Sequence, residues 1–419
     1  MVHYKQIIHI GNAISEIVDK KQVERRGYLQ FLEMFRDDTR LIKVITGVRR
    51  CGKSTLLDQF IKKLLDSSVK EEEILRMNLE SSEFMALETA AALAEYVYAR
   101  VPRQGRFYIF LDEIQRVEGW EKTVNSLLVD TEADIYITGS NSHLLSTELS
   151  TYLTGRYVSV QMLPLSFAEY KELRGAGRND QELFRDYLEY GGFPLVDPSL
   201  GKTAVTSILQ DLYNSIIFQD VVSRGNIRNT GELLRLVSYM MFNIGNISSL
   251  RKITEGLGDV HRNTVEKYLG LLEEACVLYR ADRFDLRSTA LNPLPKYYAV
   301  DPGLRNIAAG FSSADRGRVL ENVVYLELLR RGDQVPVGKW DAQEVDFVAS
   351  RPMAGKEYYQ VCYGFLQEST EERELAPLQA IKDNFPKTVL TMDPWGSSTT
   401  RDGILIRNVV EWLLAGDEK

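Results

Sequence analysis

One stretch, residues 41–60, constrains the fold of this chain more than any other. It reads LIKVITGVRRCGKSTLLDQF: a short strand-forming run, a glycine turn and an apolar pattern with helical spacing. Gly47, four further residues, Gly52, Lys53 and Ser54 have the spacing of a phosphate-binding loop between a strand and a helix. Glycines let backbone N–H groups curl around phosphate oxygens, and the helix N-terminus adds a positive dipole end. The sequence therefore predicts an α/β fold with a nucleotide-binding core.

The same pattern assigns roles within the loop. Lys53 is expected to hold the β- and γ-phosphates of ATP, and Ser54 to bind Mg²⁺ through its hydroxyl group. Arg49 and Arg50 either contact phosphate or form a salt bridge that shapes the loop, and the sequence leaves both roles open. The predicted nucleotide contacts are Gly47, Arg49, Arg50, Cys51, Gly52, Lys53, Ser54 and Thr55.

A second motif supplies the acidic residues that such a loop requires. Residues 107–113 read FYIFLDE, five apolar residues followed by Asp112 and Glu113. A near-continuous apolar run is typical of a buried parallel strand, whose carboxyl end lies beside the loop in such sheets. We expect Asp112 to bind Mg²⁺, directly or through water, and Glu113 to polarise the attacking water.

A third apolar run predicts another strand and a polar residue near the γ-phosphate. Residues 134–141 read DIYITGSN. P-loop ATPases of the AAA+ type place a polar sensor of the γ-phosphate at this point, for which Asn141 is the first choice and Ser140 the second. The alternative is that either residue caps a helix beginning near Ser142.

Arg156 follows this strand in the segment LTGRY, residues 153–157. An arginine that reaches the γ-phosphate, within one chain or from a neighbouring subunit, stabilises transition-state charge. The alternative is a surface arginine in a loop. Action on a neighbour requires a dimer or a ring, whereas action within one chain requires only a monomer.

Composition argues against several other classes of protein. The 419 residues include 51 Lys and Arg against 59 Asp and Glu, a net charge of −8, which does not suit a surface coated for nucleic acid. No apolar run approaches the ~18 residues of a membrane span, and the N-terminus lacks the apolar core of a signal peptide. Three scattered cysteines and four scattered histidines indicate neither a disulfide framework nor a metal site. We expect a cytoplasmic protein with reduced thiols and no membrane partner.

Several motifs together resemble the prokaryotic AAA+-type ATPase family in which a C-terminal domain of unknown function follows the ATPase. They are GVRRCGKSTLL, IFLDEIQRVEGWEKTVNSLL, IYITGSNSHLLSTELSTYLTGRYVSVQMLPLSFAEY and YGGFP, and the similarity runs from near residue 20 to the C-terminus. The resemblance implies a parallel-sheet P-loop ATPase core, then a winged helix, then an α/β fold like that of PD-(D/E)XK nucleases.

These patterns divide the chain into four segments. Residues 20–170 are expected to form the ATPase core. Residues 171–228 are expected to form a helical lid or connector, although packing alone explains their helical pattern equally well. Residues 229–290 have the element order of a winged helix, and residues 291–419 form the PD-(D/E)XK-like segment.

The winged-helix segment makes DNA a candidate partner. Its third predicted helix is the element that enters the major groove in such modules. Basic and acidic residues are nearly equal in number over residues 228–290, so the segment suits protein packing as well as DNA. The candidate DNA contacts are His261, Arg262, Asn263 and Lys267.

The C-terminal segment has the nuclease order but lacks part of the chemistry. Glu321, Asp346 and Gln360 occupy the positions at which PD-(D/E)XK nucleases hold Mg²⁺. A neutral amide at Gln360 replaces a carboxylate, and Cys362 replaces the lysine that orients water. We expect a degenerate site with nuclease activity absent or strongly weakened. Glu344 and Glu357 are further carboxylates that offer alternatives, but nothing in the sequence gives either of them a compensating role.

The leading hypothesis is an ATPase in which Mg²⁺-dependent hydrolysis drives a conformational change in the attached winged-helix and nuclease-like module. The alternative is a nucleotide-gated DNA-binding or assembly module with little turnover. A third hypothesis, an active nuclease guided by ATP, is weakened by Gln360 and Cys362. DNA, an unidentified protein and further copies of the chain are the macromolecular partners that these hypotheses allow.

Overall fold

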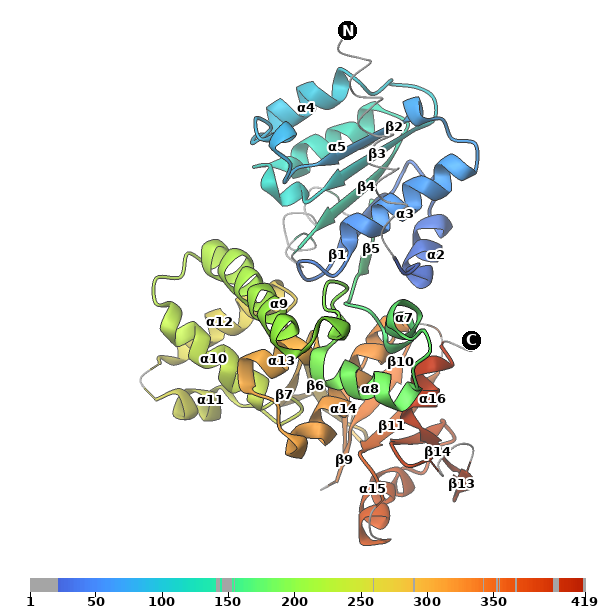
Figure 1. The fold of residues 1–419 in the computed structure, drawn as a ribbon, viewed down its shortest axis with the longest axis vertical. Coiled ribbons are helices and arrows are strands. Elements are labelled where there is room, and N and C mark those ends of the chain that lie inside the picture. Colours follow the sequence, from blue (N-terminus) through green and yellow to red (C-terminus); the bar gives the residue numbers. More distant parts are fainter. Residues whose placement is uncertain are drawn as a thin grey trace. The chain divides into compact units, whose positions relative to one another are not determined.

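The computed structural model divides into two compact units, which meet in the chain between Met162 and Leu163. It describes residues 22–140, 144, 153, 155–258, 260–288, 291–341, 343–351, 353, 355–365, 368–394 and 399–416. Figure 1 labels the helices and strands. The N-terminal unit carries the phosphate-binding motif, and the C-terminal unit carries the predicted winged-helix and nuclease-like segments.

A five-stranded parallel sheet with the order β2-β3-β4-β1-β5 forms the centre of the N-terminal unit. The strands are β1 (Ile42–Thr46), β2 (Ile74–Asn78), β3 (Phe107–Asp112), β4 (Ala133–Gly139) and β5 (Tyr157–Gln161). The helices are α2 (Arg26–Met34), α3 (Lys53–Asp66), α4 (Ala90–Tyr98) and α5 (Trp120–Asp130).

Apolar side chains cover both faces of this sheet, as a parallel sheet requires. On one face, Val97 of α4 and Leu127 of α5 share a core with the apolar residues of β1, β3 and β4. On the other face, the Phe60 ring of α3 lies 6.4 Å from the Phe110 ring and 5.2 Å from the Tyr136 ring. Figure 1 accordingly shows the sheet between α4 and α5 on one side and α3 on the other.

The strand order determines which residues meet at the site. β4 lies between β1 and β3, and the carboxyl ends of parallel strands share one edge of a sheet. Thr46, Asp112 and Gly139 end these three strands. Three motifs that are far apart in the sequence therefore meet at one edge.

Helices dominate the first part of the C-terminal unit. They are α7 (Phe167–Arg174), α8 (Asp180–Tyr190) and α9 (Lys202–Ser215), and α9 continues as a π-helical stretch, η6 (Ile216–Ser223). Both α8 and α9 pack against α13 (Pro302–Ala309) of the same unit. The predicted connector segment is therefore built into the C-terminal unit.

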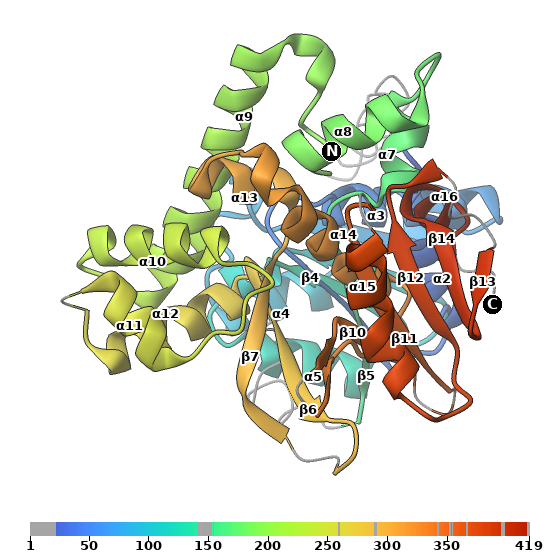
Figure 2. The same ribbon diagram turned by 90° about the horizontal axis from the view of Figure 1, so that it is seen from below.

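Three helices and a long hairpin come next in the chain. The helices α10 (Thr230–Phe242), α11 (Leu250–Leu257) and α12 (Arg262–Glu274) pack against one another. They are followed by the antiparallel strands β6 (Leu278–Asp285) and β7 (Leu291–Ala299). Figure 2 shows the helices gathered beside this hairpin. The order of elements is the one expected for a winged helix.

Two sheets organise the remainder of the unit. After α14 (Arg316–Arg330), β8 (Val337–Trp340) and β9 (Gln343–Val345) extend the hairpin into a sheet of order β7-β6-β8-β9. The second sheet, of order β10-β11-β12-β14-β13, contains β10 (Phe347–Ser350), β11 (Lys356–Cys362), β12 (Lys387–Thr391), β13 (Thr399–Arg401) and β14 (Ile404–Asn408). α15 (Glu368–Ala380) and α16 (Val409–Leu414) pack against this second sheet.

The mixed α/β class predicted from the sequence is confirmed by this architecture. The predicted ATPase segment, residues 20–170, extends slightly past the unit boundary at Met162, and the other three predicted segments lie in the C-terminal unit. Within the described ranges, no helix is both long enough and apolar enough to cross a membrane.

Candidate nucleotide-binding site

The loop between β1 and α3 has the backbone conformation of a phosphate cradle. Gly47 has a φ of +146° and Gly52 a φ of +110°, values that glycine adopts far more readily than other residues. A Cβ atom on Gly47 would lie only 2.2 Å from the carbonyl oxygen of Met162. The loop therefore closes tightly against the chain after β5, and its backbone and the N-terminus of α3 fit a phosphate group.

Lys53 is buried at the start of α3 and folds back over the loop. Its ammonium group donates to the carbonyl oxygens of Gly47 (3.0 Å) and Val48 (3.4 Å). A carboxylate oxygen of Glu113 lies 3.4 Å away, and only 2% of the Lys53 side chain is exposed. Burial opposes the charge of this ammonium group, but the neighbouring acidic groups outweigh burial and raise the pKa of Lys53 above its ordinary value. The side chain is therefore held in its charged form beside the loop, where a phosphate anion is a suitable partner.

Asp112 lies at the end of β3 with both carboxylate oxygens engaged. One accepts a hydrogen bond from the Thr138 hydroxyl group, and the other lies 2.9 Å from the Arg76 guanidinium group. Burial opposes ionisation, but the charge of Arg76 and hydrogen bonds from Thr138 and Ser54 outweigh it and lower the pKa of Asp112. Asp112 is therefore ionised at neutral pH.

Ser54 and Asp112 together fit a Mg²⁺ ion. Hydroxyl and carboxylate oxygens are ligands that this ion prefers, and the two side chains are hydrogen-bonded to each other. Because Thr138 and Arg76 already occupy the Asp112 oxygens, contact through water is favoured over direct contact. Sequence reasoning missed Arg76, whose signal was a basic residue inside the strand sequence ILRMN.

Glu113 turns away from the strand direction and toward Lys53. Its φ is +55°, in the left-handed region that non-glycine residues rarely adopt. Its backbone N–H donates to the Thr138 hydroxyl oxygen (3.0 Å), and its carboxylate accepts a hydrogen bond from Gln115. Backbone strain of this kind persists where the surrounding structure imposes it, often at functional sites. The carboxylate is thereby held beside the loop.

The contacts of Arg49 match one of the two roles that the sequence left open, the salt bridge. Its guanidinium group lies 3.0 Å from Glu80, which also lies 2.7 Å from Arg116. Arg49 therefore belongs to a salt-bridge network that shapes the loop. Arg50 is exposed with a φ of +64°, and its role stays open.

Cys51 is fully buried, and burial raises the pKa of its thiol group. Its carbonyl oxygen accepts a hydrogen bond from the guanidinium group of Arg25 (3.1 Å). Arg25 is itself only 3% exposed, so a buried cation supports the loop from the segment before α2. Sequence reasoning missed this contact, because nothing in the pattern distinguishes Arg25 from the adjacent Arg26.

Of the two predicted γ-phosphate sensors, the structure describes Ser140. Ser140 is buried, and its hydroxyl oxygen accepts a hydrogen bond from Gln115 (3.3 Å), whereas Asn141 lies outside the described residues.

The Arg156 carbonyl oxygen accepts a hydrogen bond from the N–H of Ile42, at the start of β1. The loop lies at the other end of that strand, roughly 15 Å away. Arg156 does not reach the loop of its own chain, and its predicted role within one chain is wrong.

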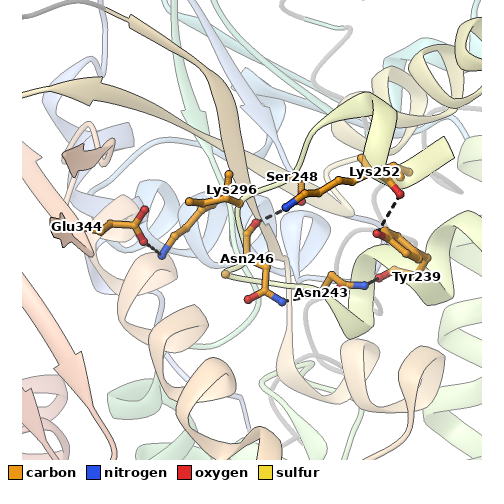
Figure 3. A pocket seen from close by; sticks show the side chains of 10 residues that line it. Tyr239, Asn243, Asn246, Ser248, Lys252, Lys296 and Glu344 are labelled. Atoms are coloured by element: carbon orange, nitrogen blue, oxygen red, sulfur yellow. Dashed lines mark hydrogen bonds and ion pairs between the residues drawn. The ribbon is translucent and has the colours of Figure 1, made fainter. Parts of the chain in front are cut away.

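A second charged cluster lies in the C-terminal unit. The Lys296 ammonium group of β7 lies 2.7 Å from Glu344, 3.1 Å from Glu321 and 3.9 Å from Asp346. Only 5% of the Lys296 side chain is exposed. Figure 3 shows Lys296 and Glu344 pointing toward each other beside a pocket of about 470 Å³.

Of the four residues predicted for the degenerate nuclease site, two face Lys296 and two have other contacts. Glu321 and Asp346 face Lys296. The Gln360 side chain instead accepts a hydrogen bond from the Asp346 backbone N–H (3.3 Å) and donates to Glu374 (3.1 Å). Cys362 packs in the apolar core, where burial raises its thiol pKa to about 12.

Lys296 is the residue of this cluster that sequence reasoning missed. The signal was a charged side chain within the strand sequence LNPLPKYYA. Burial, together with the charge of Glu321, raises the pKa of Asp346 well above its ordinary range. In the part of the chain that the structure describes, no group of three His, Cys, Asp or Glu side chains is arranged to hold a metal ion.

The candidate DNA contacts lie near the start of α12. His261 precedes the helix, Arg262 and Asn263 begin it, and all three are exposed. Lys267 is exposed in the following turn, where its ammonium group donates to the carbonyl oxygen of Gly225 (3.2 Å). These side chains therefore form an exposed polar and basic surface.

Two relatives match nearly the whole chain. An uncharacterized protein from Haemophilus influenzae is 40% identical over 409 residues, which cover 95% of this chain and 100% of the relative. The uncharacterized protein MJ1544 from Methanocaldococcus jannaschii is 31% identical over 401 residues, 88% of each chain. This chain belongs to their family.

The N-terminal part of the chain contains an AAA domain. Residues 39–171 match the profile of an AAA domain, and residues 181–315 match a domain of unknown function, DUF8612. The AAA part of the resemblance is therefore confirmed. The winged helix and the nuclease-like fold stay predictions.

Solved structures resemble the chain at low sequence identity. The Walker-type ATPase of Pyrococcus abyssi is 14% identical with a TM-score of 0.48, over 68% of this chain and 95% of that one. AMPPCP-bound DnaA from Aquifex aeolicus is 13% identical with a TM-score of 0.31, over 59% and 86%. Aeropyrum pernix Orc1 in complex with DNA is 14% identical with a TM-score of 0.30, over 68% and 92%. At these values the likeness carries no argument about function.

Proposed function

We propose that the protein binds ATP with Mg²⁺ and hydrolyses it, and that this cycle changes the conformation of the C-terminal unit. One observation carries the proposal: Lys53, Asp112 and Glu113 converge at the sheet edge beside a loop that only glycine can close at Gly47. The match of residues 39–171 to an AAA domain supports it.

The binding step uses groups that are already in place. Lys53 would exchange its carbonyl contacts for the β- and γ-phosphates, while loop N–H groups surround the phosphate oxygens. Ser54 and Asp112 would hold Mg²⁺, which when bound supplies positive charge that stabilises the phosphoryl group. Arg76 keeps Asp112 ionised for this role.

Glu113 would act as the general base. Once phosphate engages Lys53, the Glu113 carboxylate is left to accept a proton from the water that attacks the γ-phosphorus in line. The bond from that phosphorus to the bridging oxygen breaks, and ADP and phosphate leave. The strained backbone of Glu113 and its Gln115 contact support this orientation.

The test compares Glu113→Gln with the wild type in ATP binding and in turnover. We expect binding to be retained and turnover to fall by at least about 100-fold, because a general base contributes 10²- to 10⁴-fold. Glu118→Gln is a matched control at an exposed carboxylate on the same segment. Equal hydrolysis by Glu113→Gln and the wild type would contradict the base assignment, and a wild type that binds no ATP would contradict the whole proposal.

A second candidate function is a nucleotide-gated DNA-binding or assembly module with slow turnover. It is favoured by three packed helices, a hairpin and the exposed His261, Arg262 and Asn263. Binding of short duplex DNA should tighten with ATP relative to ADP, weaken with salt and fall in Arg262→Ala. Absence of DNA binding at low salt would instead favour a protein partner as the ligand of this surface.

The position of Arg156 makes assembly part of the proposal. Because it lies at the opposite end of β1 from its own loop, we propose that it acts on a neighbouring copy. Size measurements with and without ATP should then show a nucleotide-dependent dimer or ring whose ATPase falls in Arg156→Ala. A protein that turns over ATP as a monomer at wild-type rate in Arg156→Ala would refute this role.

Nuclease activity is not part of the proposal. Lys296 lies where the carboxylates Glu321, Glu344 and Asp346 meet. Arg283 lies 3.0 Å from Glu344 as a second cation, and burial raises the pKa of Asp346, so groups of the chain itself already occupy the positions that a metal ion would need. The purified protein is expected to leave DNA intact with Mg²⁺ or Mn²⁺. A metal-dependent cut that Asp346→Ala abolishes would show that this interpretation is wrong.

A further inference from the structure

Gln115 joins the candidate base to the end of the neighbouring strand. It lies in the short turn η3 (Ile114–Arg116) that comes directly after Glu113. Its amide nitrogen donates to the Glu113 carboxylate and to the Ser140 hydroxyl oxygen (3.3 Å). One side chain therefore contacts both the residue that would accept a proton and the residue directly after β4.

The chemistry of the neighbours sets the orientation of this amide. An ionised carboxylate only accepts hydrogen bonds, so the NH₂ group of Gln115 must face Glu113 and its carbonyl oxygen must point elsewhere. That oxygen is buried, and within the described ranges no hydrogen-bond donor reaches it. A buried acceptor without a donor costs about 1–3 kcal/mol. The contact between Gln115 and Glu113 is therefore made at a cost in the stability of the fold.

The backbone around Gln115 is adapted to this placement. A Cβ atom on Gly139 would lie 1.7 Å from a methyl carbon of Leu144 and 2.5 Å from the Gln115 carbonyl oxygen, so glycine at the end of β4 leaves room for both side chains. Glu113, with its positive φ, directly precedes the turn that carries Gln115. The backbone at both ends of the contact is therefore compatible with this position of the amide.

We propose that Gln115 is a positioning residue for hydrolysis, which fixes the Glu113 carboxylate and couples it to the end of β4, where the γ-phosphate sensor is expected. Lys53 contacts one oxygen of Glu113 and Gln115 contacts the other. When phosphate engages Lys53, Gln115 is the contact that keeps the base aimed at the attacking water. This inference rests on the proposed ATP hydrolysis.

The experiment measures steady-state hydrolysis and ATP affinity for Gln115→Leu, which keeps the bulk but removes the donor. We expect kcat to fall about tenfold with ATP and ADP affinity unchanged, since a base-positioning contact acts in the transition state and not on bound nucleotide. Gln104→Leu is the matched control, the same substitution at an exposed site before β3.

Two further variants separate positioning from a general loss of structure. In a Glu113→Gln background, Gln115→Leu should cause no further loss, because residues that act as one unit are not additive. Gln115→Asn keeps the amide but is one methylene shorter, so it should show the same fall in kcat in a folded protein even if the leucine variant is insoluble.

The outcomes are distinct. A wild-type kcat in Gln115→Leu or Gln115→Asn would overturn the inference, as would an equal further loss in the Glu113→Gln background. A wild type that binds ATP but does not hydrolyse it would overturn the proposed hydrolysis, and this inference with it.

Discussion

The two units each contain a buried lysine that faces carboxylates, and the two clusters differ in the groups that surround the lysine. Lys53 has carbonyl oxygens at 3.0 and 3.4 Å and the Glu113 carboxylate at 3.4 Å. Lys296 has carboxylates at 2.7 and 3.1 Å and a third at 3.9 Å. Lys53 is therefore held mainly by backbone carbonyl groups, as the proposed phosphate site requires, whereas Lys296 is held by a closed cluster of carboxylates.

This difference has its origin in the cost of burying charge. A lysine held mainly by neutral carbonyl groups can exchange them for an anionic ligand, whereas a lysine surrounded by carboxylates of its own chain is already saturated. The Lys53 ammonium group rests mainly on a glycine loop that also presents N–H groups. Lys296 instead joins β7 to α14 and to the β9–β10 segment, so its role is to hold elements together.

The largest expected effect comes from breaking the saturated cluster. Lys296→Met would leave buried carboxylates without their cation, and removal of one partner of a buried pair costs about 3–5 kcal/mol. Urea unfolding should show this loss in the C-terminal unit, while ATP affinity is unchanged. Lys252→Met, at an exposed lysine of the same pocket, is the control. Unchanged stability in Lys296→Met would mean that the cluster does not hold the elements together.

The corresponding substitution in the N-terminal unit should affect ATP binding more than stability. Lys53→Met removes the charge that phosphate requires, so ATP affinity should fall by at least about 100-fold, equivalent to about 2.7 kcal/mol. The free energy of unfolding should fall by less than in Lys296→Met, because the Lys53 ammonium group has one carboxylate neighbour and two neutral carbonyl groups. Calorimetric titration and urea unfolding measure the two quantities. Loss of stability with retained ATP affinity would reverse the comparison.

The smallest effect is expected at Asp346, and it depends on pH. Its pKa is raised well above the ordinary value by burial and by Glu321, so the folded state binds this proton more tightly than the unfolded state. Its contribution to stability is therefore present below the unfolded pKa and lost as pH rises through the folded pKa. Asp346→Asn should remove this pH dependence of the free energy of unfolding and lower that free energy by about 1 kcal/mol. An identical pH dependence of unfolding in both proteins would contradict the assignment.

The N-terminal unit was largely predictable because its signals are local. The loop spacing, the run before Asp112 and the run before Ser140 each identify a strand and the polar residues at its end. Only one sheet edge can receive the carboxyl ends of parallel strands, so adjacency of Lys53 with Asp112 and Glu113 can be inferred from fold class alone.

The contacts around these residues were not predictable in the same way. Arg76 reaches Asp112 across 36 positions, and Arg25 reaches the loop across 26. Gln115 is close to Glu113 in the chain, but its role depends on Ser140, which lies directly after β4. Arg156 was assigned from its place in the chain, and the direction of β5 put it at the wrong end of the sheet.

By itself, the sequence determined the α/β class, the phosphate loop and the acidic pair, because each depends on spacing within a few residues. Only the tertiary structure decided which charges are compensated. Whether a buried lysine binds a ligand or locks two elements depends on distances between residues far apart in the chain. Lys296, Glu321 and Glu344 come together only after β7, α14 and β9 have packed.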